Sequence, residues 1–145
     1  MQEGMLFHAM NGTSSSVYFE QILFHLEGQL DIEILQESFN ILLERYEILR
    51  TAIVYDKIDK PKQVVLAKRV SDILFKDISD LDKKDRVDYI EEFKKDDIKR
   101  GFDLTKDTLI RMSVIKKDAN SYGLVLSFHL LQTSQVLQLE QWYLH

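Results

Sequence analysis

Residues 31–51 constrain the fold more strongly than any other stretch of the sequence. Along this segment, small or apolar side chains recur every three or four positions, which is the spacing of one face of a helix. Asp31 offers a side-chain acceptor to the first free backbone amides, and Glu33 places negative charge at the positive end of the helix dipole. The pattern predicts a helix of about five turns, with one face in a core and the other in water. The residues of the predicted core face are Leu35, Ser38, Phe39, Leu42, Tyr46 and Leu49.

Alternating or β-branched runs predict strands on both sides of this helix. In chain order, the predicted strands are 17–27, 52–55, 63–66, 73–78, 109–116 and 122–129. The first ends at Gly28, the second and third are expected to form a hairpin, and the last two to pair antiparallel. We expect an antiparallel or mixed sheet with strand 122–129 inside it and helix 31–51 packed across it.

Residues 80–100 form the most highly charged stretch, and Gly101 is placed to end a helix there. A narrow apolar stripe and the surrounding charges predict a solvated helix that lies on a surface. With a short helix at 2–10, the pattern indicates an α+β fold made of one lobe. The stripe consists of Val87, Ile90, Phe93 and Ile98.

Charge and composition exclude several classes of partner. The chain has 19 basic and 24 acidic residues and a net charge of -5, which leaves no basic surplus for nucleic-acid phosphates. It has no cysteine, which excludes disulfides and is typical of the cytoplasm. The first ten residues lack the features of a signal peptide, and the longest apolar stretch, 124–131, is too short to span a bilayer. We therefore expect a cytoplasmic protein without nucleic-acid or membrane partners.

Few residues carry a recognisable chemistry. The sequence has no HExxH, GxxxxGK[ST], GxGxxG or GxSxG motif, and its four histidines lack metal-ligand spacing, so we expect no metal and no directly bound cofactor. His129 stands apart because it ends the apolar strand 122–129. Residue type alone favours a hydrogen-bonded core histidine there over a catalytic one. Arg50 suits either the helix dipole or a structural ion pair.

Three segments, in the correct order, resemble the condensation domains of nonribosomal peptide synthetases. Residues 1–10, MQEGMLFHAM, resemble the family's opening PMQ-G-hLFH motif. The end of the predicted helix is similar to RHExLRT, with Tyr46 in place of the motif histidine. Farther along, GFDLTKDTLIRMSVI resembles the FDL–x–x–GPLhR segment, and LVLSFH leads into the position of HHxxxDG. The residues that match RHExLRT are Arg45, Glu47, Leu49, Arg50 and Thr51.

The HHxxxDG motif itself is degraded. His129 falls on its first histidine, Leu130 on the second, and Ser134 and Gln135 on the Asp and Gly. If one residue were deleted, His129 would become the second histidine, yet DG would still not follow. The family fold has two chloramphenicol-acetyltransferase-like lobes, and the resemblance implies that residues 1–145 are the first lobe, with an atypical tail at 131–145.

The resemblance implies a peptide-bond-forming acyltransferase. In this family, acyl or peptidyl and aminoacyl thioesters are carried on the phosphopantetheine of carrier proteins, and the second histidine takes part in bond formation. The motif aspartate pairs with an arginine, for which Arg50 is the counterpart, so Arg45, Glu47 and Arg50 are expected to form a structural motif. His129 would be the remnant of the catalytic motif, and the chain would be inactive alone.

Two interpretations stay open. The first is a donor-side lobe with catalytic ancestry. The second is a non-catalytic module that docks a carrier protein or self-associates, most simply as a homodimer, through the exposed face that a second lobe would cover.

Overall fold

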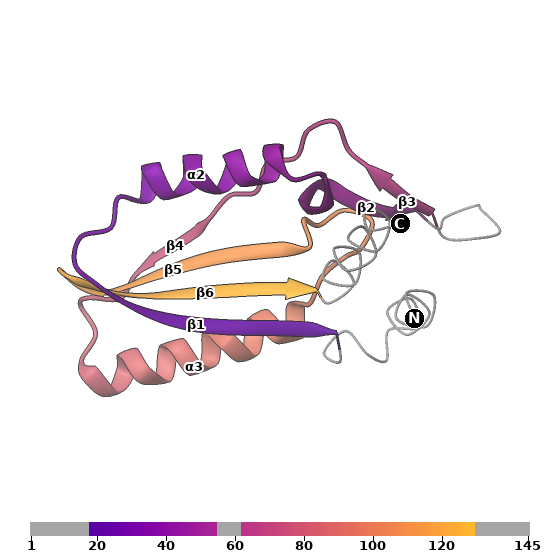
Figure 1. Cartoon of the computed structure of the whole chain (residues 1–145). Helices are drawn as coiled ribbons and strands as arrows, with labels where there is room; N and C mark the ends of the chain where they lie inside the picture. Colours follow the sequence, from indigo (N-terminus) through magenta and orange to yellow (C-terminus); the bar gives the residue numbers. More distant parts are fainter. Residues whose placement is uncertain (1–17, 55–61, 130–145) are drawn as a thin grey trace, which may run out of the picture.

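The computed structural model describes residues 18–54 and 62–129 of the chain, and Figure 1 shows their arrangement. The predicted helix at 2–10 and the tail at 131–145 lie outside this part. The elements, in chain order, are β1 (Phe19–Glu27), α2 (Ile32–Arg45), the 3-10 helix η1 (Glu47–Arg50), β2 (Thr51–Val54), β3 (Lys62–Val65), β4 (Leu74–Asp77), α3 (Lys83–Arg100), β5 (Ile110–Asp118) and β6 (Ser121–His129).

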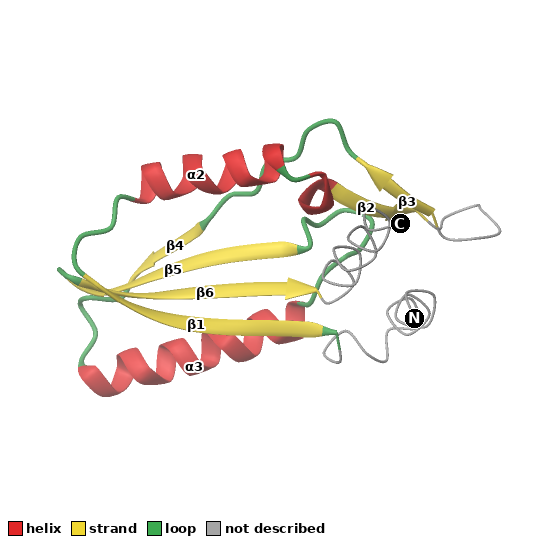
Figure 2. Ribbon diagram, viewed as in Figure 1, coloured by secondary structure: helices red, strands yellow, loops and turns green. Residues whose placement is uncertain are grey.

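Four strands form one mixed sheet in the order β1-β6-β5-β4. The pairings β1–β6 and β6–β5 are antiparallel, whereas β4 runs parallel to β5. The prediction that strand 122–129 lies inside the sheet is confirmed, because β6 has a neighbour on each side. The predicted hairpin is also confirmed, since β2 and β3 pair antiparallel as a separate two-stranded sheet. The α+β fold class follows from these elements (Figure 2).

The two long helices lie on opposite sides of the four strands in the view of Figure 2. Helix α3 covers one face of the sheet through Ile90, which packs with Ile78, Ile115 and Val125 in a buried cluster. On β6, Gly123 lies against the same cluster, and a Cβ there would make ordinary contact with Leu23 at 3.5 Å. Helix α3 therefore encloses the core on the side of the sheet that bears these residues.

Helix α3 begins and ends where its sequence indicates. The side chain of Asp82 accepts a hydrogen bond from the backbone of Asp85, which satisfies one free amide of the first turn. At the other end Gly101 has φ 61°, a backbone conformation that glycine adopts without a Cβ clash. The predicted apolar stripe is partly wrong: Val87 and Ile98 are exposed, whereas Asp97 is buried. Asp97 follows Ile90 by seven positions and therefore shares its face of the helix.

The core face predicted for the first helix is also partly wrong. Helix α2 buries Phe39 and Leu43, one turn apart, whereas Leu42 is 45% exposed. The α-helix ends at Arg45, because Tyr46 has the extended angles φ -109° and ψ 109°. The 3.6-residue period therefore does not continue to Tyr46 and Leu49, and the buried stripe is centred one position farther along than the sequence suggested.

Helix α2 is tied to the sheet through the segment that precedes β4. The amide group of Gln36 accepts from the backbone of Ile73 at 2.7 Å and donates to the carbonyl of Ser71 at 2.8 Å. The side-chain oxygen of Asn40 accepts from the backbone of Ser71 at 3.2 Å. These polar side chains, which pattern analysis places on the solvent side, thus fix the path of the chain into β4.

Candidate functional site

The C-terminal end of β6 is the place where the fold gathers the residues of interest. His129 lies opposite Phe19, the first residue of β1, and its backbone N–H donates to the carbonyl of Leu109 at 3.0 Å. Because β1 and β5 flank β6 here, the position of His129 is set by a neighbouring strand on each side of β6. The loop that follows α3 reaches the same end through Phe102.

The His129 imidazole is enclosed by aromatic rings. The Tyr18 ring is tilted against it at 6.0 Å between centroids, and Phe102 meets it edge-on at 6.3 Å and 88°. The residue is 3% exposed. Burial disfavours the charged form and lowers the pKa of His129 to about 4 from the usual 6.5. At neutral pH the side chain is therefore an uncharged imidazole with one N–H donor and one acceptor nitrogen.

A buried ion pair lies next to these rings. Nη2 of Arg111, on β5, is 2.6 Å from Oδ1 of Asp97, near the end of α3. The same carboxylate accepts from Nε of Arg111 at 2.8 Å, from Nε2 of Gln21 at 3.0 Å and from the hydroxyl of Ser127. One carboxylate thus links α3 to β1, β5 and β6.

Aromatic contacts connect this ion pair to the histidine. The Arg111 guanidinium carbon lies 4.5 Å from the centroid of Phe102 and 6.0 Å from that of Phe19. The centroids of the Phe19 and Phe102 rings are 5.4 Å apart. Phe102 therefore contacts both the guanidinium, over its ring, and the imidazole, whose plane is nearly perpendicular to it.

Sequence reasoning missed Asp97 because it belongs to a stretch rich in charge, and it gave no role to Arg111, a single charged residue in the predicted strand 109–116. The signal that marks Asp97 is its spacing from Ile90 and Phe93, which places it on the inner face of α3. Arg111 lies two residues before Ser113 on β5, so the two side chains share one face of the sheet. Ser113 is buried on that face.

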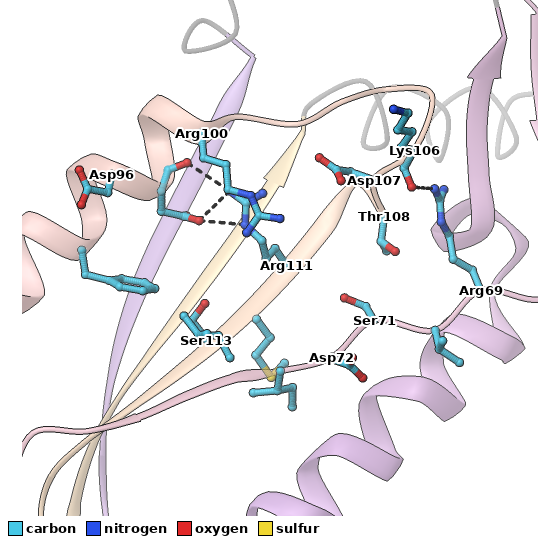
Figure 3. Close-up of a pocket in the computed structure, with 16 residues that line it drawn as sticks. Arg69, Ser71, Asp72, Asp96, Arg100, Lys106, Asp107, Thr108, Arg111 and Ser113 are labelled. Atoms are coloured by element: carbon cyan, nitrogen blue, oxygen red, sulfur yellow. Dashed lines mark hydrogen bonds and ion pairs between the residues drawn. The ribbon is translucent and has the colours of Figure 1, made fainter.

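Arg111 also lines a cavity of about 560 Å³, which lies between the end of α3, the start of β5 and the segment before β4 (Figure 3). Its charged lining is balanced. Across its rim, the Arg69 guanidinium donates to the backbone carbonyls of Thr51 and Lys106. Arg111 in its wall is fully engaged with Asp97 and the carbonyl of Gly101. The charged residues of the lining are Arg69, Asp72, Asp96, Asp97, Arg100, Lys106, Asp107 and Arg111.

Two further features are absent from the described part of the chain. Residues 18–54 and 62–129 hold no group of three or more His, Cys, Asp or Glu side chains placed to bind a metal ion. None of the helices in these ranges is long and apolar enough to cross a membrane.

The condensation-domain family model matches residues 1–131. This chain is a member of the condensation-domain family. It is 43% identical over 129 residues to gramicidin S synthase 2 of Brevibacillus brevis, covering 89% of this chain and 3% of that protein. Bacitracin synthase 3 of Bacillus licheniformis is 39% identical over 129 residues, covering 89% of this chain and 2% of that protein.

The fold comparison agrees with this assignment. The starter condensation domain of rhizomide synthetase superposes with a TM-score of 0.77 at 15% identity, covering 90% of this chain and 29% of that one. The chain thus spans only a small part of the curated relatives and under a third of this solved neighbour. It is a fragment of a condensation domain, and this extent fits an N-terminal lobe.

The structure separates the residues that match the family's RHExLRT motif. Arg45 is exposed, with its guanidinium 5.7 Å from the ring of Tyr46. Glu47 is exposed, and its carbonyl accepts from the Thr51 hydroxyl at 3.2 Å. His129, in contrast, is buried. The exposed side chains of Arg45 and Glu47 therefore do not belong to the buried surroundings of His129.

Among the described residues, backbone carbonyls rather than a carboxylate hold Arg50. Its Nη1 donates to the carbonyls of Leu66 at 2.5 Å and Ala67 at 3.2 Å. Its Nε atom is buried without a hydrogen-bond partner in the described structure. A motif aspartate is the expected partner of Arg50, and Ser134 occupies that position in this sequence.

Proposed function

We propose that this chain is the first lobe of a condensation domain that, when complete, joins two carrier-bound thioesters through an amide bond. The observation that carries the proposal is the position of His129, at the end of the central strand of a chain matched by the condensation-domain family. This is where the HHxxxDG motif would begin. The role of His129 as a remnant of that motif stays a prediction.

The proposed reaction is an acyl transfer. The amine of the acceptor attacks the carbonyl carbon of the donor thioester, a C–N bond forms, the C–S bond breaks, and the released thiol takes up a proton. The amine must lose a proton along the way, and a neutral imidazole next to it would accept that proton. Leu130 replaces the second motif histidine, and a leucine side chain has no lone pair with which to do so.

His129 is better suited to positioning than to proton transfer. It is enclosed by Tyr18 and Phe102, and its pKa of about 4 lies well below neutral pH. A general base works best when its pKa lies near the working pH. We therefore assign to His129 the task of fixing the end of β6, directly before the next residues of the motif in the sequence.

The proposed partners are carrier proteins, whose phosphopantetheine groups would bring both substrates, and the proposed compartment is the cytoplasm. No cofactor is assigned to the chain itself.

A titration of the isotope-labelled chain with a phosphopantetheine-loaded carrier protein tests the proposed carrier partner, with the same carrier lacking the group as matched control. Saturable shifts that require the loaded form support the proposal. Unchanged spectra at about 1 mM carrier would reject carrier binding by this lobe, since that limit corresponds to a very weak complex.

A second candidate function is self-association. The observation that favours it lies on β1, where Ile22 is 41% exposed and Phe24 is 44% exposed. These side chains are two residues apart and therefore point to the same face of the sheet. Because β1 is the edge strand of the described sheet, a second copy of the chain could pair there and cover both side chains.

A further inference from the structure

We infer that Arg111, clamped by Asp97, positions His129 through the ring of Phe102. The inference rests on the proposed function only in giving His129 a place at the reaction site. The contacts themselves belong to the fold. They join α3, β5, β6 and the loop after α3 in one continuous chain of side chains.

The first step is the clamp on the guanidinium. Each nitrogen of Arg111 has a named acceptor: Nε donates to Oδ1 of Asp97, Nη2 to the Asp97 carbonyl at 3.1 Å, and Nη1 to the Gly101 carbonyl at 2.8 Å. Both residues of the pair are largely buried, with side chains 12% and 7% exposed. The planar fork of an arginine bound at all three nitrogens has little freedom to rotate.

The second step is the clamp on the carboxylate. Oδ2 of Asp97 accepts from Gln21 on β1 and from Ser127 on β6, so the carboxylate is fixed from the sheet as well. Gln21 Nε2 also reaches the carbonyl of Lys94 on α3 at 3.2 Å. Ser127 precedes His129 by two residues on the same face of β6. Its hydrogen bond to Asp97 therefore joins the ion pair to the strand that carries the histidine.

The third step is the contact between the fixed guanidinium and the ring of Phe102. The fixed guanidinium lies 4.5 Å from the centre of Phe102, a distance at which a cation attracts the negative face of an aromatic ring. Phe102 then meets His129 edge-on. Phe19 packs against Phe102 at 5.4 Å and lies opposite His129 in the sheet. The orientation of the imidazole thus depends on a ring that the ion pair holds in place.

Groups that carry charge or titrate lie near His129 on more than one element. Tyr18 faces it from just before β1, and the Arg111–Asp97 pair lies behind Phe102, contributed by β5 and α3. Releasing Phe102 would admit water to the imidazole and ease its protonation. Loss of the nearby cation would act in the same direction, so the two causes have to be separated by experiment.

The test is a double-mutant cycle read at the imidazole of His129 by NMR of histidine-labelled whole chain, with its signals assigned by their loss in His129→Gln. The variants are Arg111→Met, Phe102→Leu and the double variant. The matched control is Arg100→Met, which removes an exposed arginine from the last turn of α3. The readouts are the ring-current shift of the imidazole protons and the pKa of His129.

We expect Arg111→Met to change the ring-current shift and to raise the pKa of His129 by about one unit, while Arg100→Met changes neither. In the Phe102→Leu background, Arg111→Met should add little, because its route to the histidine is already lost. An unchanged imidazole in folded Arg111→Met would overturn the inference, as would an equal pKa rise in both backgrounds, which indicates charge alone. If Arg111→Met does not fold, Arg111→Lys takes its place, because lysine keeps the charge but not the planar fork. An unchanged imidazole in folded Arg111→Lys would then overturn the inference. Neither readout depends on catalysis, so failure of the proposed function leaves this test intact.

Discussion

Asp97 and Arg111 form a buried ion pair, 2.6 Å between Oδ1 and Nη2, that joins the end of α3 to β5. We predict that Asp97→Asn or Arg111→Met alone destabilises the fold by about 3–5 kcal/mol, because each leaves an uncompensated charge in the interior. The double variant should lose less than the sum of the two single variants, since it buries no charge. Urea denaturation measures all three free energies of unfolding.

The matched control for this pair is Glu91→Gln. Glu91 makes an exposed ion pair with Lys94 at 3.2 Å, one turn earlier on α3. Loss of an exposed pair costs about 0–1 kcal/mol. A control that destabilises as strongly as Asp97→Asn would show that α3 is sensitive to any loss of charge, and the special position of Asp97 would be refuted.

The inner face of α2 gives a second prediction. Leu43→Asp should cost several kcal/mol of unfolding free energy, because Leu43 is fully buried and the new carboxylate has no partner. Leu42→Asp should cost less than about 1 kcal/mol, since Leu42 is 45% exposed. Denaturant melts of the two variants compare adjacent residues with the same substitution. The reverse order of stability would mean that the helix is rotated relative to this structure.

These two leucines show where the sequence is sufficient and where it is not. The spacing of residues 31–51 correctly predicts an amphipathic helix, and Asp31 caps it as expected. The pattern could not choose between Leu42 and Leu43, because Ile34 and Ile41 are also apolar yet exposed. The decision depends on where the chain leaves the helix at Tyr46 and on what lies across from it, which is tertiary information.

The site shows a similar division. Resemblance to a family singled out His129, and the strand pattern correctly put it at the end of β6. The rings of Tyr18 and Phe102 that enclose it come from distant parts of the chain, and the Asp97 carboxylate lies within a run of charges. Strand register and helix rotation bring these groups together, and neither can be read from local spacing. For the same reason, the backbone acceptors of Arg50 were not foreseen.

A third prediction concerns pH. The folded-state pKa of His129 is about 4, below the ordinary value of 6.5, so the unfolded chain binds the proton more readily. Stability from this group is therefore fully present above about pH 6.5 and is lost as the pH falls toward 4, by at most about 3 kcal/mol. His129→Gln should flatten the curve of unfolding free energy against pH in that window. His25→Gln, at an exposed position on β1, is the control for the loss of a histidine.

The fourth prediction addresses self-association. If a second copy covers β1, Phe24→Lys should shift the chain from dimer to monomer in sedimentation experiments, because it places a charge within the apolar contact. Val87→Lys on α3 is the control, since Val87 is an exposed apolar residue on a helix and not on β1. A wild-type chain that stays monomeric at high concentration, or a dimer indifferent to Phe24→Lys, would contradict association through β1.

The most direct test of the proposed function is an assay for the dipeptidyl thioester, with acyl- and aminoacyl-loaded carrier proteins as substrates. We predict no product above the uncatalysed rate from the chain alone or from Leu130→His. A positioned acid–base group accounts for about 10²–10⁴ in rate, whereas holding two substrates together contributes up to about 7–11 kcal/mol and is expected to require the second lobe. Product should appear when a second lobe is supplied in trans to the variant with both Leu130→His and Ser134→Asp. Product from the isolated chain would contradict its assignment as an inactive lobe, and no product from the completed, repaired domain would contradict its assignment as a condensation-domain lobe that forms amide bonds.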